Sequence, residues 1–161
     1  MKKTILVVAL VGALFTLASA QPRAIGVRFG NGADFSYQHS IGEKNMLDCT
    51  AGVSLGWLGH PGVTAVVMFD WVFDIKSGWK WYVGPGAGVG WGWGPAYKDH
   101  DYFPLRVNVG GQIGIEYNFG IPLNLSLDVR PMVNVLGFKH HHMDYWFDFG
   151  PALGVRYRFN K

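Results

Sequence analysis

The chain has a single cysteine, no strong excess of charge of either sign, and no long apolar run after its first twenty residues. One cysteine, Cys49, excludes an internal disulfide. The missing apolar run argues against a membrane-spanning helix, which needs ~18 residues or more. Lysine and arginine together number 14, against 11 acidic residues. A chain so close to neutral offers no electrostatic basis for binding nucleic acid.

The first twenty residues have the pattern of a secretory signal peptide. Lys2 and Lys3 form a basic start, residues 5–17 are a short apolar run, and residues 18–20 read Ala-Ser-Ala, a small-residue cleavage site. We expect cleavage after this site, because the run falls short of the ~18 residues of a spanning helix. Residues 21–161 are then expected to form one domain.

Apolar residues alternate with polar residues or glycines along several segments. Between Leu47 and Trp57 the odd positions are apolar and the even positions are polar or glycine. Residues 123–135 and 147–159 follow the same rule except at Met132 and Ala152. Successive side chains of a strand point to opposite faces, so each segment predicts a two-faced strand. With 23 glycines and no helix-favouring runs, the chain is predicted to be all-β.

The polar face carries charges of both signs in the middle of strands. These residues are Asp70, Arg106, Glu116, Asp128, Arg130, Asp148 and Arg156. Such a face suits the interior of a membrane barrel, whose lipid side is continuous and uncharged. The pattern therefore predicts an antiparallel up-and-down transmembrane β-barrel.

Eight strands are predicted. They are residues 24–30, 34–42, 46–58, 63–75, 79–94, 105–119, 123–138 and 145–159. Tight joins at 43–45, 76–78 and 120–122 alternate with longer ones at 59–62, 95–104 and 139–144. Outer-membrane barrels have short periplasmic turns and longer extracellular loops. We therefore expect a protein of the bacterial outer membrane.

Aromatic residues recur ten positions apart on the proposed outer face. Trp81 and Trp91 form one such pair, and Phe147 and Tyr157 form another. At ~3.3 Å per residue and a tilt of ~40–45°, this separation spans roughly 24 Å, close to the apolar band of about 25 Å between two aromatic girdles. The spacing favours a membrane barrel over a soluble β-sandwich.

The interior of an eight-stranded barrel is only wide enough for side chains to fill. A run of alternating glycines at residues 84–92 leaves room for long polar neighbours such as Arg106 and Asn108. Asp128 and Arg130 lie two positions apart on one face, and we expect them to pair because burying either charge alone is costly. The lumen is therefore predicted to be closed, with a small-solute channel as an alternative.

Two segments resemble the small outer-membrane β-barrel proteins common in the Bacteroidetes, related in architecture to OmpX and OmpA barrels. One is residues 24–30, continuing through 35–39 to the turn at 43–45, and the other is residues 121–137. The end Arg156-Tyr157-Arg158-Phe159 resembles the terminal-strand signal read by the barrel-assembly machinery. The resemblance implies the barrel, its outer-membrane location, and lipids and this machinery as partners. It implies no catalytic residue.

One group of residues resembles a metal site. It comprises His140, His141, His142 and Asp144, with Asp99, His100 and Asp101 in the preceding long join. Imidazole and carboxylate are zinc and copper ligands, but adjacent histidines rarely converge on one ion. We therefore expect these histidines and aspartates to be ordinary solvent-exposed loop residues, and we predict no metal or cofactor.

A lipid A-modifying enzyme is the alternative from another functional class. Its candidate residues are His39 with Ser36 or Ser40, or His60 in a long join. A nucleophile needs a base within hydrogen-bond reach, yet the alternation places His39 on the opposite face from both serines. We therefore expect no enzyme.

The remaining expectation is a structural or surface-interaction role, with a possible extracellular ligand of unknown identity. It rests on aromatic residues in the long joins or directly beside them, which are Tyr97, Tyr102, Phe103, Tyr145 and Trp146. Aromatic side chains are enriched at interfaces, although the same residues also suit anchoring at a membrane surface.

Overall fold

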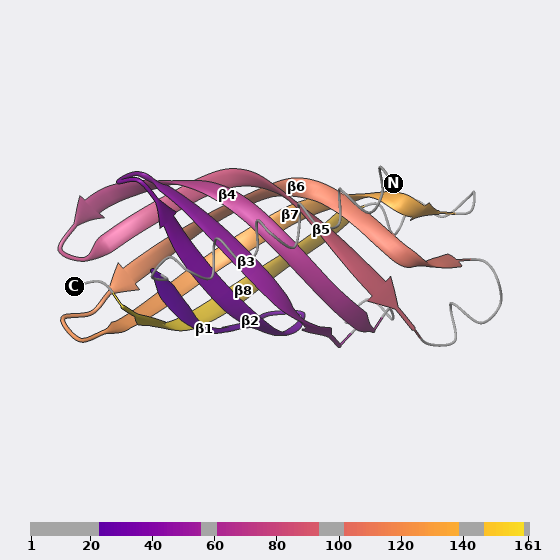
Figure 1. Cartoon of the computed structure of the whole chain (residues 1–161), viewed down its shortest axis with the longest axis horizontal. Helices are drawn as coiled ribbons and strands as arrows, with labels where there is room; N and C mark the ends of the chain where they lie inside the picture. Colours follow the sequence, from indigo (N-terminus) through magenta and orange to yellow (C-terminus); the bar gives the residue numbers. More distant parts are fainter. Residues whose placement is uncertain (1–22, 56–60, 94–101, 139–146, 160–161) are drawn as a thin grey trace, which may run out of the picture.

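Eight antiparallel strands form a closed barrel in the computed structural model, which describes residues 23–55, 61–93, 102–138 and 147–159 (Figure 1). The strands are β1 (Ala24–Phe29), β2 (Gly32–Ile41), β3 (Asn45–Ser54), β4 (Gly62–Lys76), β5 (Trp79–Gly92), β6 (Tyr102–Asn118), β7 (Leu123–Phe138) and β8 (Phe147–Arg158).

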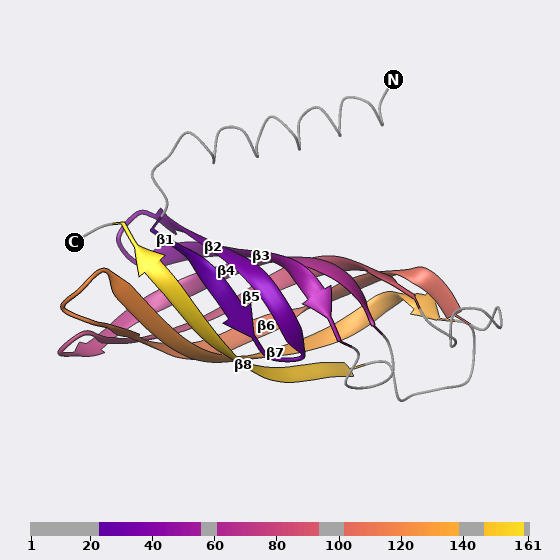
Figure 2. The same ribbon diagram turned by 90° about the horizontal axis from the view of Figure 1, so that it is seen from below.

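Each strand pairs with its neighbours in sequence, and β1 pairs with β8 to close the sheet. In the closing pair Ala24 lies opposite Arg158 and Phe29 lies opposite Leu153. Figure 2 shows the strands tilted along the length of the barrel. The predicted eight-stranded, up-and-down antiparallel barrel is confirmed.

The barrel has two distinct ends. The end with the short joins 42–44, 77–78 and 119–122 is called the turn end here, and the end where β3, β5 and β7 finish is called the loop end. In the join between β4 and β5, Ser77 and Gly78 both have positive φ, of 52° and 89°. Positive φ at both central residues is characteristic of the type I′ turn, whose twist matches that of the flanking strands.

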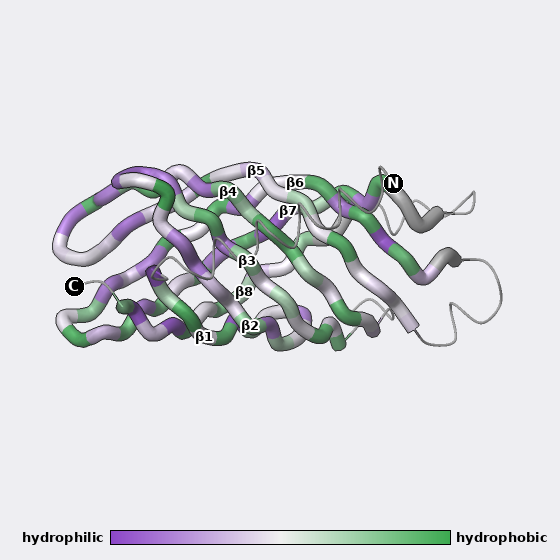
Figure 3. The backbone as a smooth tube through the Cα atoms, viewed as in Figure 1, coloured by the Kyte–Doolittle hydropathy of each residue, from purple (hydrophilic) through white to green (hydrophobic). Residues whose placement is uncertain are grey.

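The two faces of the sheet differ sharply in polarity. Figure 3 shows hydrophobic and hydrophilic residues alternating along the strands. The inward face holds buried charged and polar side chains, among them Asp48, Asp128 and Arg156. The outward face exposes large apolar side chains, including Phe35 (56%) and Leu127 (54%). The predicted orientation, with apolar residues outside and ions inside, is confirmed for the described residues.

The predicted strand limits are close to those of the structure, with one clear correction. Residues 95–104 were expected to form a loop, but β6 begins at Tyr102, which pairs with Phe138. The pairing register of β6 shifts between Tyr102 and Val107. Pro104 lies within this irregularity, and proline has no N–H for the ladder, so the strand continues past it with a break in pairing.

Residues 1–20, expected to be a signal peptide, lie outside the described residues. No helix in the described part of the chain has the length and apolar character needed to cross a membrane.

Candidate functional site: the charged lumen

Arg28 on β1 joins three strands near the middle of the lumen. Its Nη2 donates to Asp128 Oδ1 on β7 at 2.7 Å, and its Nε donates to the same oxygen at 3.0 Å. Nη1 lies 3.2 Å from Asp34 Oδ2 on β2. The Tyr82 hydroxyl, from β5, donates to Asp128 Oδ2 at 3.3 Å. Both oxygens of the Asp128 carboxylate are therefore satisfied.

Arg130 on β7 forms the second cluster. Its Nη1 donates to Thr50 Oγ1 at 2.7 Å, its Nη2 lies 3.3 Å from Asp48 Oδ2, and its Nε donates to Gln112 Oε1. Gln112 in turn donates from Nε2 to Asp70 Oδ2 at 3.2 Å. One guanidinium thus links β7 to β3 and β6, and through Gln112 to β4.

Arg156 on β8 is the largest of the fully buried side chains, with 1% of its surface exposed. Its Nε donates to Ser36 Oγ at 2.7 Å, its Nη1 donates to Ser126 Oγ, and its Nη2 lies 3.4 Å from Asp48 Oδ2. Ser36 also donates to Asp48 Oδ1 at 3.3 Å. Asp48 is therefore shared by Arg130 and Arg156.

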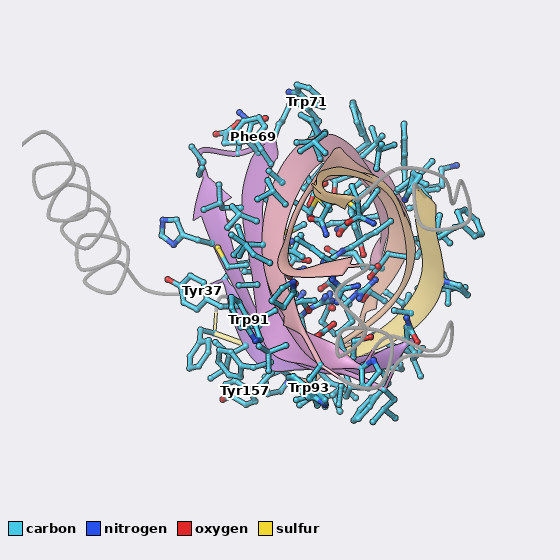
Figure 4. The ribbon with its side chains drawn as sticks, turned by 90° about the vertical axis from the view of Figure 1, so that its right-hand side faces the viewer. Tyr37, Phe69, Trp71, Trp91, Trp93 and Tyr157 are labelled. Carbon is cyan, nitrogen blue, oxygen red and sulfur yellow. The ribbon has the colours of Figure 1, made fainter. Side chains whose placement is uncertain are left out.

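A separate cluster of polar side chains lies at the turn end of the lumen. Arg23 pairs with the fully buried carboxylate of Glu116, which also accepts from Asn118 Nδ2 at 3.3 Å. Asn124 donates from Nδ2 to Asn118 Oδ1 at 3.0 Å. Figure 4, a view along the barrel, shows side chains filling the interior of the ring of strands.

Glycines on the inner face make room for these large side chains. A Cβ at Gly114 would lie 2.4 Å from Tyr82 Cζ, and a Cβ at Gly154 would lie 2.6 Å from Arg156 Nη1. Either Cβ would force the neighbouring side chain to move, because such contacts are shorter than 3.0 Å. The glycines therefore make room for Tyr82 and Arg156. The predicted glycine run at residues 84–92 has the same role at Gly88, where a Cβ would lie 2.4 Å from Asn108 Oδ1.

The expected pair of Asp128 and Arg130 is present but is not the closest contact of either residue. Arg130 Nε lies 3.8 Å from Asp128 Oδ1, whereas Arg28 lies 2.7 Å from that oxygen. Arg28 and Asp48 are not among the predicted lumen charges. Both nevertheless occupy inward positions of strands in which polar and apolar residues alternate, which is the pattern that identifies the other lumen charges.

Three other charged residues were predicted to lie in the lumen, and the structure places each of them differently. Arg106 is half-buried, and its Nε and Nη2 have no hydrogen-bond partner among the described residues. Asp70 belongs to the cluster of Arg130. The side chain of Asp148 lies outside the described set.

The candidate catalytic residues are not brought together. Ser36 is buried in the lumen and bonded to Arg156, whereas His39 lies on the outer face, stacked on Tyr37 with ring centroids 6.4 Å apart. Ser40, next to His39 in sequence, is exposed near the turn end of β2. His60 lies outside the described residues.

The candidate metal ligands, at residues 99–101 and 140–144, also lie outside the described residues. Within the part of the chain that the structure describes, no group of three or more His, Cys, Asp or Glu could hold a metal ion. Cys49 is a free cysteine on the outer face of β3, opposite Tyr37 and Val67.

No family model matches the chain, and no curated protein is significantly similar to it. The closed eight-stranded antiparallel barrel is consistent with the OmpX-like fold that the sequence resembles.

Proposed function

We propose that the chain is an outer-membrane β-barrel protein with a closed polar lumen, and that its role is structural or surface-interacting rather than catalytic. The observation that carries this proposal is the polarity of the sheet, which is apolar outside and ionic inside. A soluble barrel has water around it, so an outward face of valine, leucine, phenylalanine and tryptophan would be costly there.

Closure of the sheet supports the same proposal. In lipid, backbone N–H and C=O groups have no water to bond, so only helices and closed barrels can span a bilayer. The pairing of β1 with β8 removes the free edges along the paired residues. Apolar side chains from every strand surround this closed sheet.

Aromatic residues on the outer face fit the two interfaces of a bilayer. Trp71, Trp79 and Tyr157 belong to the turn end, and Trp91 and Trp93 to the loop end. Figure 4 shows Trp71, Trp91, Trp93 and Tyr157 pointing away from the lumen. Tryptophan and tyrosine are enriched at membrane interfaces because their rings are amphipathic.

The lumen contents argue for a closed barrel rather than a channel. Arg28, Arg130 and Arg156 cross the interior from three strands and are held by carboxylates on others. A solute passing through would have to break several buried ion pairs at once. We therefore expect no steady ion conductance.

Heat-modifiable gel migration of outer-membrane fractions tests the proposal. A folded barrel in the membrane fraction should run differently from the boiled chain. Planar-bilayer recordings of the same material should show no steady conductance. A chain found in the soluble fraction would overturn the membrane location, and steady conductance would overturn the closed lumen.

The enzymatic alternative has its own test. Deletion and overexpression should leave the lipid A mass spectrum unchanged, because the structure does not pair His39 with Ser36. A changed acylation pattern would contradict the non-catalytic role.

A further inference from the structure

Arg106 on β6 is a lumen arginine that no described carboxylate holds. Its Nε and Nη2 are buried, and neither has a hydrogen-bond partner among the described residues. The same two nitrogens of Arg28 both donate to Asp128 Oδ1, at 3.0 and 2.7 Å. This edge of a guanidinium is the fork that binds a carboxylate or a phosphate. The fork of Arg106 therefore suits an anion that the described part of the chain does not supply.

The guanidinium of Arg106 lies along the inner wall of the barrel, over glycines. Gly90 on β5 lies opposite Arg106, and Gly62 begins the next strand, β4. Arg106 Nη2 would lie 3.0 Å from a Cβ at Gly62 and 3.7 Å from a Cβ at Gly90. Because Nε and Nη2 make no hydrogen bond to the described residues, the guanidinium can turn toward the lumen without losing one from either nitrogen.

Exposure increases toward the loop end of the lumen, the end from which Figure 4 views the barrel. Met68 and Met132, from β4 and β7, are buried. Asn108 and Arg106, the next inward residues toward the loop end, are half-buried. A Cβ at Gly150, an inward position of β8, would have nothing within 4 Å, so side chains do not fill the lumen on that side. This end therefore admits a small solute, and the buried methionines close it toward the middle.

An unpartnered acceptor lies on the same face of β6. Asn108 is the next inward residue after Arg106, and its Oδ1 is buried without a hydrogen-bond partner among the described residues. Buried polar atoms are normally hydrogen-bonded. Hydrogen phosphate has oxygens that accept from a guanidinium and a hydroxyl that donates to an amide oxygen. Its chemistry therefore matches both unpartnered side chains at once, whereas a simple carboxylate matches only the arginine.

Described carboxylates in the middle of the lumen already have cationic partners. Asp128 pairs with Arg28, and Asp48 is shared by two further arginines. A charge taken out of water without such a partner is costly. An anion from solution would offset this cost at Arg106.

We propose that Arg106 and Asn108 form a binding site for a small oxyanion of the hydrogen phosphate type at the loop end of the lumen. The ligand comes from the water at that end, because the closed sheet separates both side chains from the outer face. It does not pass through, since Arg28, Arg130 and Arg156 cross the middle. The site goes beyond the role proposed above, and it requires the closed barrel but not its membrane location.

Isothermal titration calorimetry with inorganic phosphate tests this inference on the full chain, folded in octyl glucoside micelles, which carry no anionic group. The variant Arg106→Gln removes both the charge and the fork. The matched control is Arg158→Gln at the turn end, because Arg158 is also half-buried and its Nε has no hydrogen-bond partner among the described residues. Both variants lose one positive charge, so a general charge effect would weaken phosphate binding equally in the two.

The unmodified chain and Arg158→Gln should bind phosphate with equal affinity. Arg106→Gln should bind it roughly tenfold more weakly, equivalent to about 1.4 kcal/mol of binding free energy. Equal binding by all three proteins, or no binding by the unmodified chain, would overturn the inference. Adding dipalmitoylphosphatidylglycerol to the micelles should leave phosphate binding unchanged. Competition by this lipid would assign the site to a headgroup and overturn the aqueous source of the ligand.

Unfolding in urea without phosphate separates a binding role of Arg106 from a structural one. Arg106→Gln should keep the midpoint of the unmodified chain, because the described residues give its Nε and Nη2 no hydrogen bond to lose. A clearly lower midpoint would mean that the protein itself supplies the partner, and would overturn the inference. Heat-modifiable migration from the same micelles shows that the barrel has formed, so a failure to bind phosphate there refutes this site alone.

Discussion

Arg130 is buried in the lumen, with 6% of its surface exposed. Its three guanidinium nitrogens contact Asp48, Thr50 and Gln112 separately. Its removal would leave Asp48 with Arg156 as its remaining ion-pair partner. Breaking a buried pair from one side is more damaging than replacing both partners. Here Asp48 would keep only one of its two arginines, and Thr50 Oγ1 and Gln112 Oε1 would lose their buried donor. The same reasoning applies to the other paired arginines of the lumen.

The variant Arg130→Leu should therefore unfold at a clearly lower urea concentration in detergent. We expect a loss of about 3–5 kcal/mol in the free energy of unfolding. Lys44→Leu, at an exposed position in a turn, is the control and should change little. An unaltered midpoint for Arg130→Leu would contradict the network.

Tyr82 donates a single hydrogen bond, to the carboxylate of Asp128. The variant Tyr82→Phe keeps the ring and removes only this donor. It should lower the free energy of unfolding by about 1.5–3 kcal/mol, because the acceptor is charged, and this is less than the loss expected for Arg130→Leu. A loss as large as that of the arginine variant would mean that Tyr82 has another role in the lumen.

At the scale of elements, the barrel depends on glycines where strands approach large inward side chains. A Cβ at Gly114 would collide with the ring of Tyr82, whereas a Cβ at Gly150 would have nothing within 4 Å. Both glycines occupy inward positions, on β6 and β8. They form a matched pair for testing how tightly the lumen is packed.

Gly114→Ala should lower the free energy of unfolding by about 1–3 kcal/mol, the usual cost of overpacking a filled interior. Gly150→Ala should leave it nearly unchanged. Unfolding in urea, followed by tryptophan fluorescence, measures both. Equal effects would show that the lumen is not packed as described.

The hairpin between β4 and β5 depends on the positive φ of Gly78. Gly78→Ala places a Cβ at that backbone angle and 2.6 Å from the carbonyl oxygen of Asn118. We expect a loss of about 1–3 kcal/mol, the cost of a strained backbone position. Gly120→Ala has open space around it and is the control. Loss of stability in the control alone would contradict this account of the turn.

At the scale of the whole molecule, the sequence was sufficient to predict the barrel and the direction of most side chains. The period of two assigns each residue to a face once the strand is located, so Asp128 and Arg130 were placed inside and Leu125 outside. Tight turns such as Ser77-Gly78 located the strand ends on one side.

The partners across the lumen could not be predicted in the same way. Arg28 and Asp128 are 100 positions apart in sequence. They meet because β1 pairs with β8, and because the stagger of the strands places them at the same height. That stagger is a property of the closed sheet, and no local sequence pattern predicts it. Nearby residues such as Asp128 and Arg130 therefore looked like the main pair.

The central claim is that the apolar face of this barrel contacts lipid, and Cys49 offers a direct test. It is the chain's one cysteine and lies on the outer face. A nitroxide attached to Cys49 in vesicle-reconstituted protein should collide with oxygen, which concentrates in the bilayer, far more often than with a water-soluble nickel chelate. Collisions dominated by the nickel chelate would place this face in water and contradict the account.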